Sequence, residues 1–354
     1  MNARNSMEDD EMAHRDDPAP DSAGTIETPD TAAGDTSPAL WVYERHKNIV
    51  SLGFKVEASL FSARSPYQQI DIVETAGHGR MLLNDGVVMI SERDEFVYHE
   101  MIAHVPLLTH PNPRRVLIVG GGDGGTAREV LKHQTVERVV MVEIDEMVVR
   151  ACREHMPSVA GALSDPRLTL LFEDGVKYVA ESNDGFDLAI IDSTDPVGPA
   201  APLFDSAFYR NTAALLDENG VMITQSESPF YDPEIQRSMF TNQRPHFPRL
   251  HMYLFSTLTY PGGLWSFGYA SKGPCPVRDL DETRFTPLAA AGTAPAGSGG
   301  AEGPRRGVRY YTPAVHRAAF ALPRFVDDAL CDLLDPALYS DGEPPGLHRG
   351  GFTG

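Results

Sequence analysis

The sequence is poor in cysteine, in basic residues and in long apolar runs, and each shortage excludes a class of protein. Three cysteines among 354 residues, widely spaced, do not form the pattern of a disulfide framework or a zinc site. Lysine and arginine number 30 against 50 aspartates and glutamates, and the net charge of −20 argues against nucleic acid or an anionic membrane as a partner. No run reaches the length of a membrane span, and the acidic N-terminus is unlike a signal peptide, so we expect a cytoplasmic protein.

Composition predicts where the chain is ordered. Residues 1–38 are expected to form a disordered acidic tail, because the first 36 hold ten acidic and two basic residues and carry −8 of the charge with almost no large apolar side chains. We expect a flexible low-complexity insertion at 288–307 and a C-terminal tail at 336–354. Between them, we expect an N-terminal β domain with a connecting helix over 39–108 and a Rossmann-like catalytic domain over 109–335.

Hydrophobic periodicity predicts the elements of both domains. Residues of about 40–90 alternate apolar and polar side chains around the hairpin signal Asp85-Gly86, which predicts a small antiparallel β unit. Residues 93–110 have helical spacing. Strand and helix patterns then alternate, which predicts a doubly wound, mostly parallel α/β sheet. The expected strands are 116–119, 139–143, 168–172, 187–191 and 220–225, and the expected helices are about 124–134, 145–156 and 205–217.

The stretch "VLIVGGGDGGTAREVL" places a glycine turn after the first strand of this sheet. Gly120, Gly122 and Gly125 satisfy the G-x-G-x-x-G spacing, and Glu143 ends the next strand, where an acid can accept hydrogen bonds from ribose hydroxyls. Asp123 inside the turn would repel a pyrophosphate, so an adenosine ligand is favoured over a dinucleotide. The alternative is a structural glycine turn beside a solvated acid.

Further acids follow the next two strands. Asp174, before Gly175, can accept from an adenine amino group, although Asp-Gly is equally a plain turn. Asp192 and Asp195 stand on a proline- and glycine-rich loop, where paired acids can hold a cationic amine or take its proton. A turn aspartate would explain Asp195 before its proline, but it explains Asp192 at the end of a buried strand poorly.

Two other motifs are given no chemical role. "HEMIAH" resembles a zinc helix, but His99 and His104 are five residues apart and so point to different faces, and we expect no metal site. Cys152 has apolar neighbours at helical spacing and is expected to be a core residue rather than a nucleophile.

Together these segments resemble the polyamine aminopropyltransferase family. The resemblance is carried by "DGVVMISERDEFVYHEMIAHVPLLTHPNPRRVLIVGGGDGGTAREVLKH", "VEID", "DSTDPVGP", "TYPGGLWSFGYASKG" and "YYTPAVHRAAFALP". It covers residues 40–335 apart from the insertion. It implies transfer of the aminopropyl group of decarboxylated S-adenosylmethionine to putrescine, giving spermidine and methylthioadenosine. No cofactor and no metal are implied, the partners are these small molecules, and a homodimer or homotetramer is expected.

The resemblance also assigns roles to single residues. The proton acceptor is Asp192, with Tyr98 and Tyr260 completing the catalytic set. The donor-binding residues it implies are Gln68, Gly120, Gly122, Asp123, Glu143, Asp174, Gly175 and Pro199. The acceptor-binding residues it implies are His99, Asp123, Asp192, Asp195, Gln225 and Glu227.

Within the resemblance, Asp123 gives the glycine turn a chemical purpose. Its carboxylate attracts the terminal ammonium of the decarboxylated donor and repels the carboxylate of ordinary S-adenosylmethionine. One departure concerns the acceptor: Met89 stands where many members have glutamine. The alternatives are therefore another acceptor (agmatine, cadaverine or spermidine), a putrescine N-methyltransferase, and a non-enzymatic sensor of adenosyl ligands.

Overall fold

The computed structural model describes residues 40–196, 198–290 and 307–337. The expected acidic tail over 1–38 lies outside the described residues. So do most of the expected insertion at 288–307 and all but the first two residues of the expected tail at 336–354.

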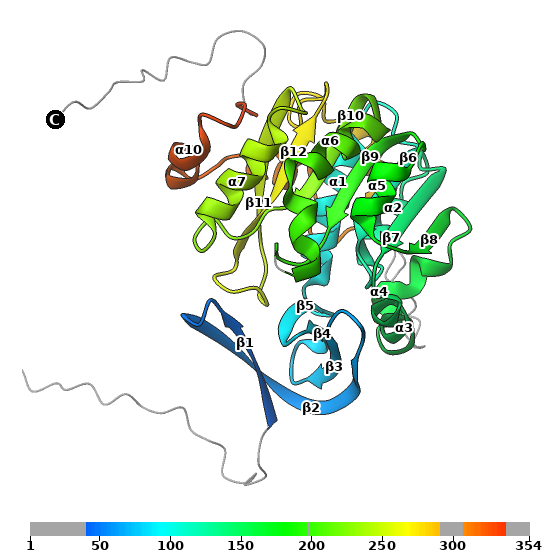
Figure 1. Ribbon diagram of the computed structural model, residues 1–354, viewed down its shortest axis with the longest axis vertical. Coiled ribbons are helices and arrows are strands. Elements are labelled where there is room, and N and C mark those ends of the chain that lie inside the picture. The colour runs from blue at the N-terminus through cyan, green and yellow to red at the C-terminus, as the bar shows by residue number, and fades with distance from the viewer. Residues whose placement is uncertain (1–39, 197, 291–306, 338–354) are drawn as a thin grey trace, which may run out of the picture. The chain divides into compact units, whose positions relative to one another are not determined.

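The N-terminal part forms a five-stranded antiparallel sheet in which each strand pairs with the next along the chain. Asp85 and Gly86 have positive φ angles of 49° and 83°, which the two-residue hairpin turn between β4 and β5 requires, so this predicted turn is confirmed. Figure 1 shows this sheet in blue and cyan. The strands are β1 (Leu40–His46), β2 (Val50–Arg64), β3 (Gln69–Thr75), β4 (Gly79–Asn84) and β5 (Val87–Ser91).

The second sheet has seven strands in the order β11-β12-β10-β9-β6-β7-β8. The five from β10 to β8 are parallel, whereas β12 runs antiparallel to both of its neighbours. The predicted mostly parallel, Rossmann-like fold is confirmed, and the antiparallel pair is an addition to the predicted strands. The strands are β6 (Arg115–Gly120), β7 (Arg138–Glu143), β8 (Leu168–Phe172), β9 (Phe186–Asp192), β10 (Leu216–Gln225), β11 (Arg249–Ser256) and β12 (Leu264–Ser271).

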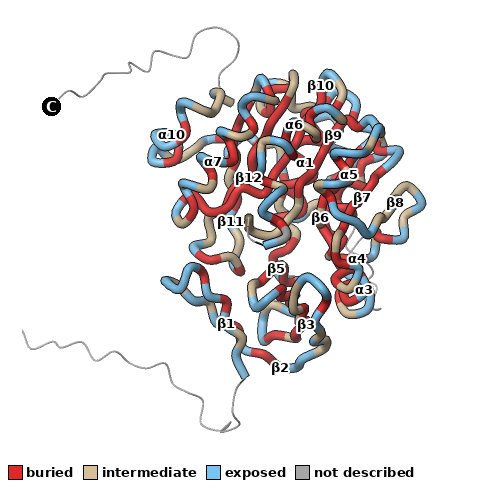
Figure 2. The backbone as a smooth tube through the Cα atoms, in the orientation of Figure 1, coloured by how far each residue is buried: buried red, intermediate tan, exposed pale blue. Residues whose placement is uncertain are grey.

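Helices cover both faces of this sheet because its strands are apolar on both sides. Val116 and Ile118 of β6 pack with α1, α2, α3 and α9, while Leu117 and Val119 face α5, α6, α7 and α10. Figure 2 shows the sheet as the buried centre between these layers. The helices are α1 (Glu95–Thr109), α2 (Gly125–Leu131), α3 (Glu146–His155), α4 (Pro157–Ala160), α5 (Gly175–Glu181), α6 (Ser206–Leu215), α7 (Pro233–Gln243), α8 (Phe285–Ala290), α9 (Pro313–Ala319) and α10 (Arg324–Leu330), with 3₁₀ turns at Gly161–Ser164, Gly198–Phe204 and Glu282–Arg284.

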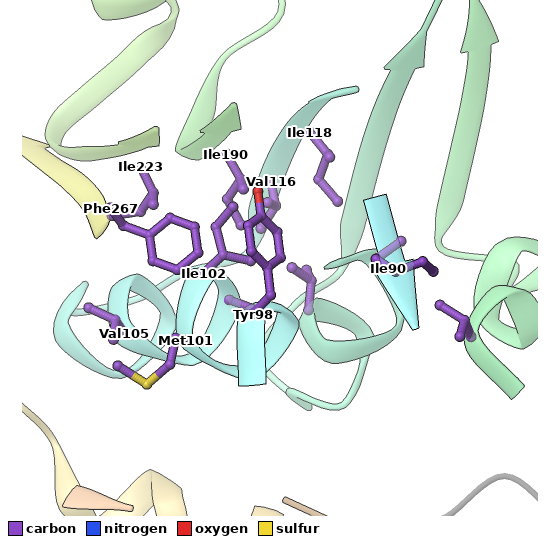
Figure 3. Close-up of a cluster of buried hydrophobic side chains, with 14 of the residues drawn as sticks. Ile90, Tyr98, Met101, Ile102, Val105, Val116, Ile118, Ile190, Ile223 and Phe267 are labelled. Atoms are coloured by element: carbon purple, nitrogen blue, oxygen red, sulfur yellow. The ribbon is translucent and has the colours of Figure 1, made fainter. Parts of the chain in front are cut away.

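Helix α1 connects the two sheets and is buried on almost every side. Its apolar residues, among them Tyr98, Met101 and Ile102, pack beneath Ile118 and Ile190 of the parallel strands, as Figure 3 shows. The polar residues of α1 are buried as well, so each of them needs a partner inside the protein.

The register of β6 against β9 brings the glycine turn to Asp192. Gly120 is the direct neighbour of Asp192 in the sheet, and the Gly121 amide donates to the Asp192 carbonyl at 2.9 Å. Gly120 has a φ of 85°, and a side chain there would overlap the Asp192 carbonyl, so only glycine fits. The turn and the acid at the end of β9 are therefore held together by the backbone.

Candidate active site

A cavity of about 340 Å³ lies at the carboxyl ends of the parallel strands and is lined by residues of both sheets. It brings most of the predicted site residues together. Those lining it are Gln68, Tyr98, His99, Gly120, Gly122, Asp123, Glu143, Asp174, Gly175, Asp192, Asp195, Gln225 and Tyr260. Glu227 lies behind Gln225 and accepts from its side-chain amide at 3.0 Å. Pro199 falls in the 3₁₀ turn at Gly198–Phe204, and its side chain lies outside the described part of the chain.

Asp192 ends β9 with both carboxylate oxygens occupied. Oδ1 accepts from the Tyr98 hydroxyl at 2.7 Å and Oδ2 accepts from Thr126 Oγ1 at 2.6 Å. Burial and then the charge of Asp123 raise the pKa of Asp192, while His99 and the two hydroxyl donors oppose that rise. Such a carboxylate is oriented, partly shielded from water and able to take up a proton.

Asp123 lies within the glycine turn, where it meets the backbone and His99. Its Oδ1 accepts from the Gly125 amide at 2.7 Å and lies 3.2 Å from His99 Nε2, an ion-pair distance without hydrogen-bond geometry. On its other side, His99 Nδ1 is 2.6 Å from Glu95 Oε2. Both ring nitrogens of His99 therefore face carboxylates of the chain itself.

Glu143 and Gln68 line the cavity on the β7 side. Glu143 is buried, and its Oε1 accepts from the Asp145 amide at 2.8 Å. Burial, with the nearby charges of Asp145 and Asp192, raises the pKa of Glu143 from 4.5 to about 7 against the effect of that hydrogen bond. The Gln68 side chain donates to Asp145 Oδ2 at 3.0 Å. Asp145 therefore connects Gln68 and Glu143, the two residues predicted to bind the donor substrate.

Asp174 caps a helix and lines the cavity at the same time. Its Oδ1 accepts from the Val176 amide at 2.8 Å at the start of α5. Asp174 thus has the structural role that a plain turn residue would have. The cap occupies only one of its two carboxylate oxygens. The adjacent Gly175 packs against Val119, whose side chain occupies the space that a Cβ would need.

A second carboxylate group, Glu44, Asp195, Glu227 and Asp232, lies where the small sheet meets the loops after β9 and β10. Burial and the charge of Asp232 raise the pKa of Asp195. Burial and the charge of Asp195 raise the pKa of Glu227 well above its usual value. Burial also raises the pKa of Glu44 to about 7, partly offset by the Val88 amide, which donates to it at 3.0 Å.

The cations beside this group come from β1 and the turn that follows it. Lys47 Nζ lies 2.6 Å from Asp232 Oδ1, and His46 Nε2 lies 3.5 Å from Asp232 Oδ2. Lysine and histidine thus pair with Asp232, while Glu44 and Asp195 face the cavity. A site with this excess of negative charge suits a cationic ligand.

Tyr260 has a hydroxyl that donates to the main-chain carbonyl of Met89 at 2.7 Å. Its ring lies edge-on to Tyr98, with centroids 6.2 Å apart, and 5.0 Å from Trp265. Burial raises the pKa of this hydroxyl well above 10, so Tyr260 is neutral. It lines the cavity as an aromatic side chain whose hydroxyl proton is hydrogen-bonded to the backbone.

Two family models match the chain over nearly all of both sheets. The "spermidine synthase tetramerisation domain" matches residues 40–92 and the "spermine/spermidine synthase domain" matches residues 95–280. The chain belongs to the spermine/spermidine synthase family. It is accordingly an enzyme of the polyamine aminopropyltransferase class, and the predicted family is confirmed.

Relatives of the family extend the match to most of the chain. The polyamine aminopropyltransferase of Moorella thermoacetica is 41% identical over 291 residues, covering 82% of this chain and 96% of its own. That of a Thermoanaerobacter species is 44% identical over 289 residues, covering 82% and 98%. A crystal structure of spermidine synthase in complex with the transition-state analogue AdoDATO has a TM-score of 0.75 at 39% identity over 82% of this chain and 95% of its own. The Thermotoga maritima spermidine synthase structure gives 0.74, at 39% identity over 82% and 94%.

Three residues that line the cavity or contact its lining were missed by the sequence reasoning. Thr126, which donates to Asp192, carries no motif of its own and becomes visible only through the turn geometry. Glu44 belongs to the small sheet and gave no signal in the catalytic part. Glu95 could have been found from the sequence, because a glutamate four residues before His99 lies on the same face of a helix.

Another polar residue of α1, His104, is not among the residues that line the cavity. Its Nδ1 lies 3.0 Å from His133 Nε2, and its Nε2 lies 3.2 Å from Glu129. His99 and His104 thus have separate partners, as their spacing predicts.

Cys152 is a buried core residue, again as predicted. Among the described residues, no helix combines the length and apolarity needed to cross a membrane.

Proposed function

We propose that this enzyme transfers the aminopropyl group of decarboxylated S-adenosylmethionine to putrescine, giving spermidine and methylthioadenosine. The observation that supports it is one cavity with two carboxylate groups, Asp123 with Asp192 at the glycine turn and the second carboxylate group at the small sheet. Donor and acceptor both bring positive charge to such a cavity. The names of the solved relatives, spermidine synthases, point to the same reaction.

The nucleoside of the donor is assigned to the β7 side. Glu143 accepts from the ribose hydroxyls, with Gln68 on the ribose and methionine-derived side. Asp174 and Gly175 take the adenine, and Pro199 lines the donor pocket. Gly120 and Gly122 let the backbone approach the nucleoside closely.

Asp123 selects the decarboxylated donor. Its charge attracts the terminal ammonium and repels the carboxylate that ordinary S-adenosylmethionine carries. A methyltransferase that uses the ordinary donor would gain nothing from an acid here. The putrescine N-methyltransferase alternative is therefore disfavoured.

Asp192 accepts the proton of the attacking amine. An acceptor amine with a pKa near that of lysine, about 10.4, arrives protonated at neutral pH. After that proton passes to Asp192, the nitrogen lone pair forms a C–N bond with the methylene carbon beside the sulfonium. The C–S bond breaks and its electron pair stays on sulfur as a neutral thioether. Because this leaving group is already good, the proposal needs no metal and no cofactor.

The acceptor lies between the two carboxylate groups. Tyr98 and Tyr260 form its aromatic walls, and His99 lies beneath the turn. Asp195 binds an acceptor amine, with Gln225 and Glu227 near the distal end. To these we add Glu44, because a primary ammonium has three N–H donors and Glu44 and Asp195 both face the cavity.

The proposal includes a homo-oligomer, since the small sheet matches a model described as a tetramerisation domain. No nucleic acid or membrane partner is proposed.

A two-way substrate panel tests the proposal. The purified enzyme is given the decarboxylated or the ordinary donor with putrescine, cadaverine, agmatine, spermidine or no amine, and methylthioadenosine release is followed by chromatography. We expect release only with the decarboxylated donor, with the highest kcat/KM for putrescine. Preference for another amine would mean that putrescine is not the main acceptor. Turnover of the ordinary donor would contradict the role proposed for Asp123.

Asp192→Asn is the matched control of that panel because it is nearly isosteric and still accepts from Tyr98. We expect it to bind methylthioadenosine as the wild type does and to lose roughly 10²–10⁴-fold in kcat. Near-normal turnover would mean that another group takes the proton.

A further inference from the structure

His99 occupies a closed space beneath the glycine turn. Its side chain is fully buried, and a side chain at Gly125 would overlap its ring. Nδ1 lies 2.6 Å from Glu95 and Nε2 lies 3.2 Å from Asp123. An imidazole between two carboxylates is matched in charge when both nitrogens carry protons.

Glu95 is itself held in place by a buried cation. Arg128 of α2 donates from NH1 to Glu95 Oε1 at 3.1 Å and from NH2 to Oε2 at 2.7 Å, a bidentate pair. The same arginine donates from Nε to Glu129 at 2.8 Å. Glu95 and Glu129 are about 8% and 1% exposed and the Arg128 side chain is 16% exposed, so this ion pair is largely removed from water. The carboxylate facing His99 therefore has a fixed position.

Resting on the proposed function, we propose that Glu95 is a positioning residue that keeps His99 an imidazolium, and that this cation fixes the Asp123 carboxylate and leaves Asp192 free to accept the proton of the acceptor. Glu95 touches neither substrate in this scheme. It acts through His99 on the two aspartates at the glycine turn.

The turn needs such a cation because two acids stand there with little water. Two neighbouring carboxylates in a buried site tend to share one proton, and a protonated Asp192 could not act as a base. His99 is faced by Glu95 and Tyr98 from α1 and by Asp123 from the turn. The groups that face Asp192 are Tyr98, His99, Asp123 and Thr126, with Tyr260 and Glu143 close enough to interact with its charge.

The titration of these groups agrees with the geometry. Burial alone would lower the pKa of His99, but Asp123 and Glu95 outweigh it and raise that pKa from 6.5 to about 10. Burial and Asp123 raise the pKa of Asp192, and the charge of His99 lowers it. Loss of the His99 charge would therefore raise the pKa of Asp192 further.

The test compares Glu95→Gln with Glu129→Gln, which removes the other partner of Arg128 and leaves His99 between its two carboxylates. Histidine side chains labelled with ¹⁵N are titrated by NMR in the complete enzyme, and kcat is measured against pH. We expect the wild type and Glu129→Gln to keep the His99 imidazolium to above pH 9. In Glu95→Gln it should lose its proton at least about one pH unit lower.

His99→Gln is a second variant, which keeps a side-chain donor and cannot carry the charge. It should move the acidic limb of the kcat profile to higher pH, because it removes the charge that lowers the pKa of Asp192, and it carries the test if Glu95→Gln fails to fold. Wild-type His99 titrating near its ordinary pKa of about 6.5 would overturn the proposal, as would an unchanged His99 titration in folded Glu95→Gln or an unmoved acidic limb in folded His99→Gln. The NMR titration needs no turnover. Failure of the proposed reaction would instead appear as a wild type that releases no methylthioadenosine from any amine.

Discussion

At the scale of single residues, burial raises the pKa of several acids in the site. Glu143 has its pKa raised from 4.5 to about 7, chiefly by burial. Between those pH values the folded protein binds more protons at Glu143 than the unfolded chain does. The contribution of this residue to stability therefore falls as the pH rises through that window. A ligand that donates hydrogen bonds to the ionised form offsets this cost.

This linkage makes nucleoside affinity depend on pH. In the proposed complex ribose hydroxyls donate to ionised Glu143, so binding favours release of its proton, and methylthioadenosine should bind more tightly as the pH rises from 5 to about 7. We expect the Kd to fall by at most about tenfold per pH unit and to level off above pH 7. Isothermal titration calorimetry in several buffers measures both the Kd and the proton released.

Glu143→Gln is the control for this effect. It should bind methylthioadenosine more weakly at pH 8 and show no pH dependence between 5 and 7. A flat wild-type profile would contradict the assignment of Glu143 to the ribose.

At the scale of elements, α1 contributes residues to the site on one side and binds a segment that is distant in the sequence on another. Glu100, which is 1% exposed, accepts from the backbone amides of Arg309, Tyr310 and Tyr311 at 2.6, 2.7 and 2.8 Å. One carboxylate thus satisfies three consecutive amides just after the undescribed segment 291–306. The helix that supplies Tyr98 and His99 is fastened to the C-terminal region at this point.

Removing that anchor should cost stability rather than chemistry. Glu100→Gln loses the charge and leaves one acceptor for three donors, so we expect the free energy of unfolding to fall by roughly 2–4 kcal/mol. Urea denaturation measures it. The control is Glu146→Gln, which breaks the exposed pair with Arg150 and should change stability by less than about 0.5 kcal/mol. Equal effects in the two variants would mean that the anchor contributes little.

How far these elements could be predicted depended on the pattern each leaves in the sequence. Parallel strands buried on both faces, such as β6 and β9, give continuous apolar runs and were predicted within one residue at each end. The antiparallel pair β11 and β12 was not among the predicted strands, because its runs are mixed with histidine, serine and glycine. The helices α5 and α7 were also missed, because they leave a weak apolar pattern: α5 buries only Gly175 and Val179, and two of the four residues that α7 buries are glutamines.

The candidate site was predictable where one strand end supplies the residue. Asp192 and Glu143 follow apolar strands, and the edge of the sheet gathers them. Contacts between distant segments were not predictable: Tyr98 donates to Asp192, 94 positions away. His99 was expected to face the acceptor through the family resemblance, and its two carboxylate neighbours emerge only when α1 packs under the turn.

At the scale of the whole molecule, the small sheet carries an unusually apolar exposed strand. Trp41 and Tyr43 of β1 are 45% and 56% exposed, and their rings are stacked with centroids 6.4 Å apart. Leu40 next to them is 62% exposed. Exposed aromatic side chains that gather on one strand are typical of an interface between proteins.

We expect this strand to contribute to the oligomer. Changing both Trp41 and Tyr43 to serine should lower the mass found by size-exclusion chromatography with light scattering, because it removes apolar area from the interface. Phe230→Ser, at a residue 59% exposed on the loop after β10, should leave the mass unchanged. A wild type with the mass of a single chain would contradict the proposed oligomer.

The division of the cavity between two sheets has a consequence for how this enzyme can diversify. Glu44 and Met89 reach the cavity from the small sheet, whereas the glycine turn and Glu143 belong to the large one. On the proposed function, substitutions at Glu44 and Met89 alter which amine is accepted while Glu143 and the glycine turn stay unchanged. Amine preference can thus evolve, or be engineered, at these two positions without change to the residues assigned to the nucleoside.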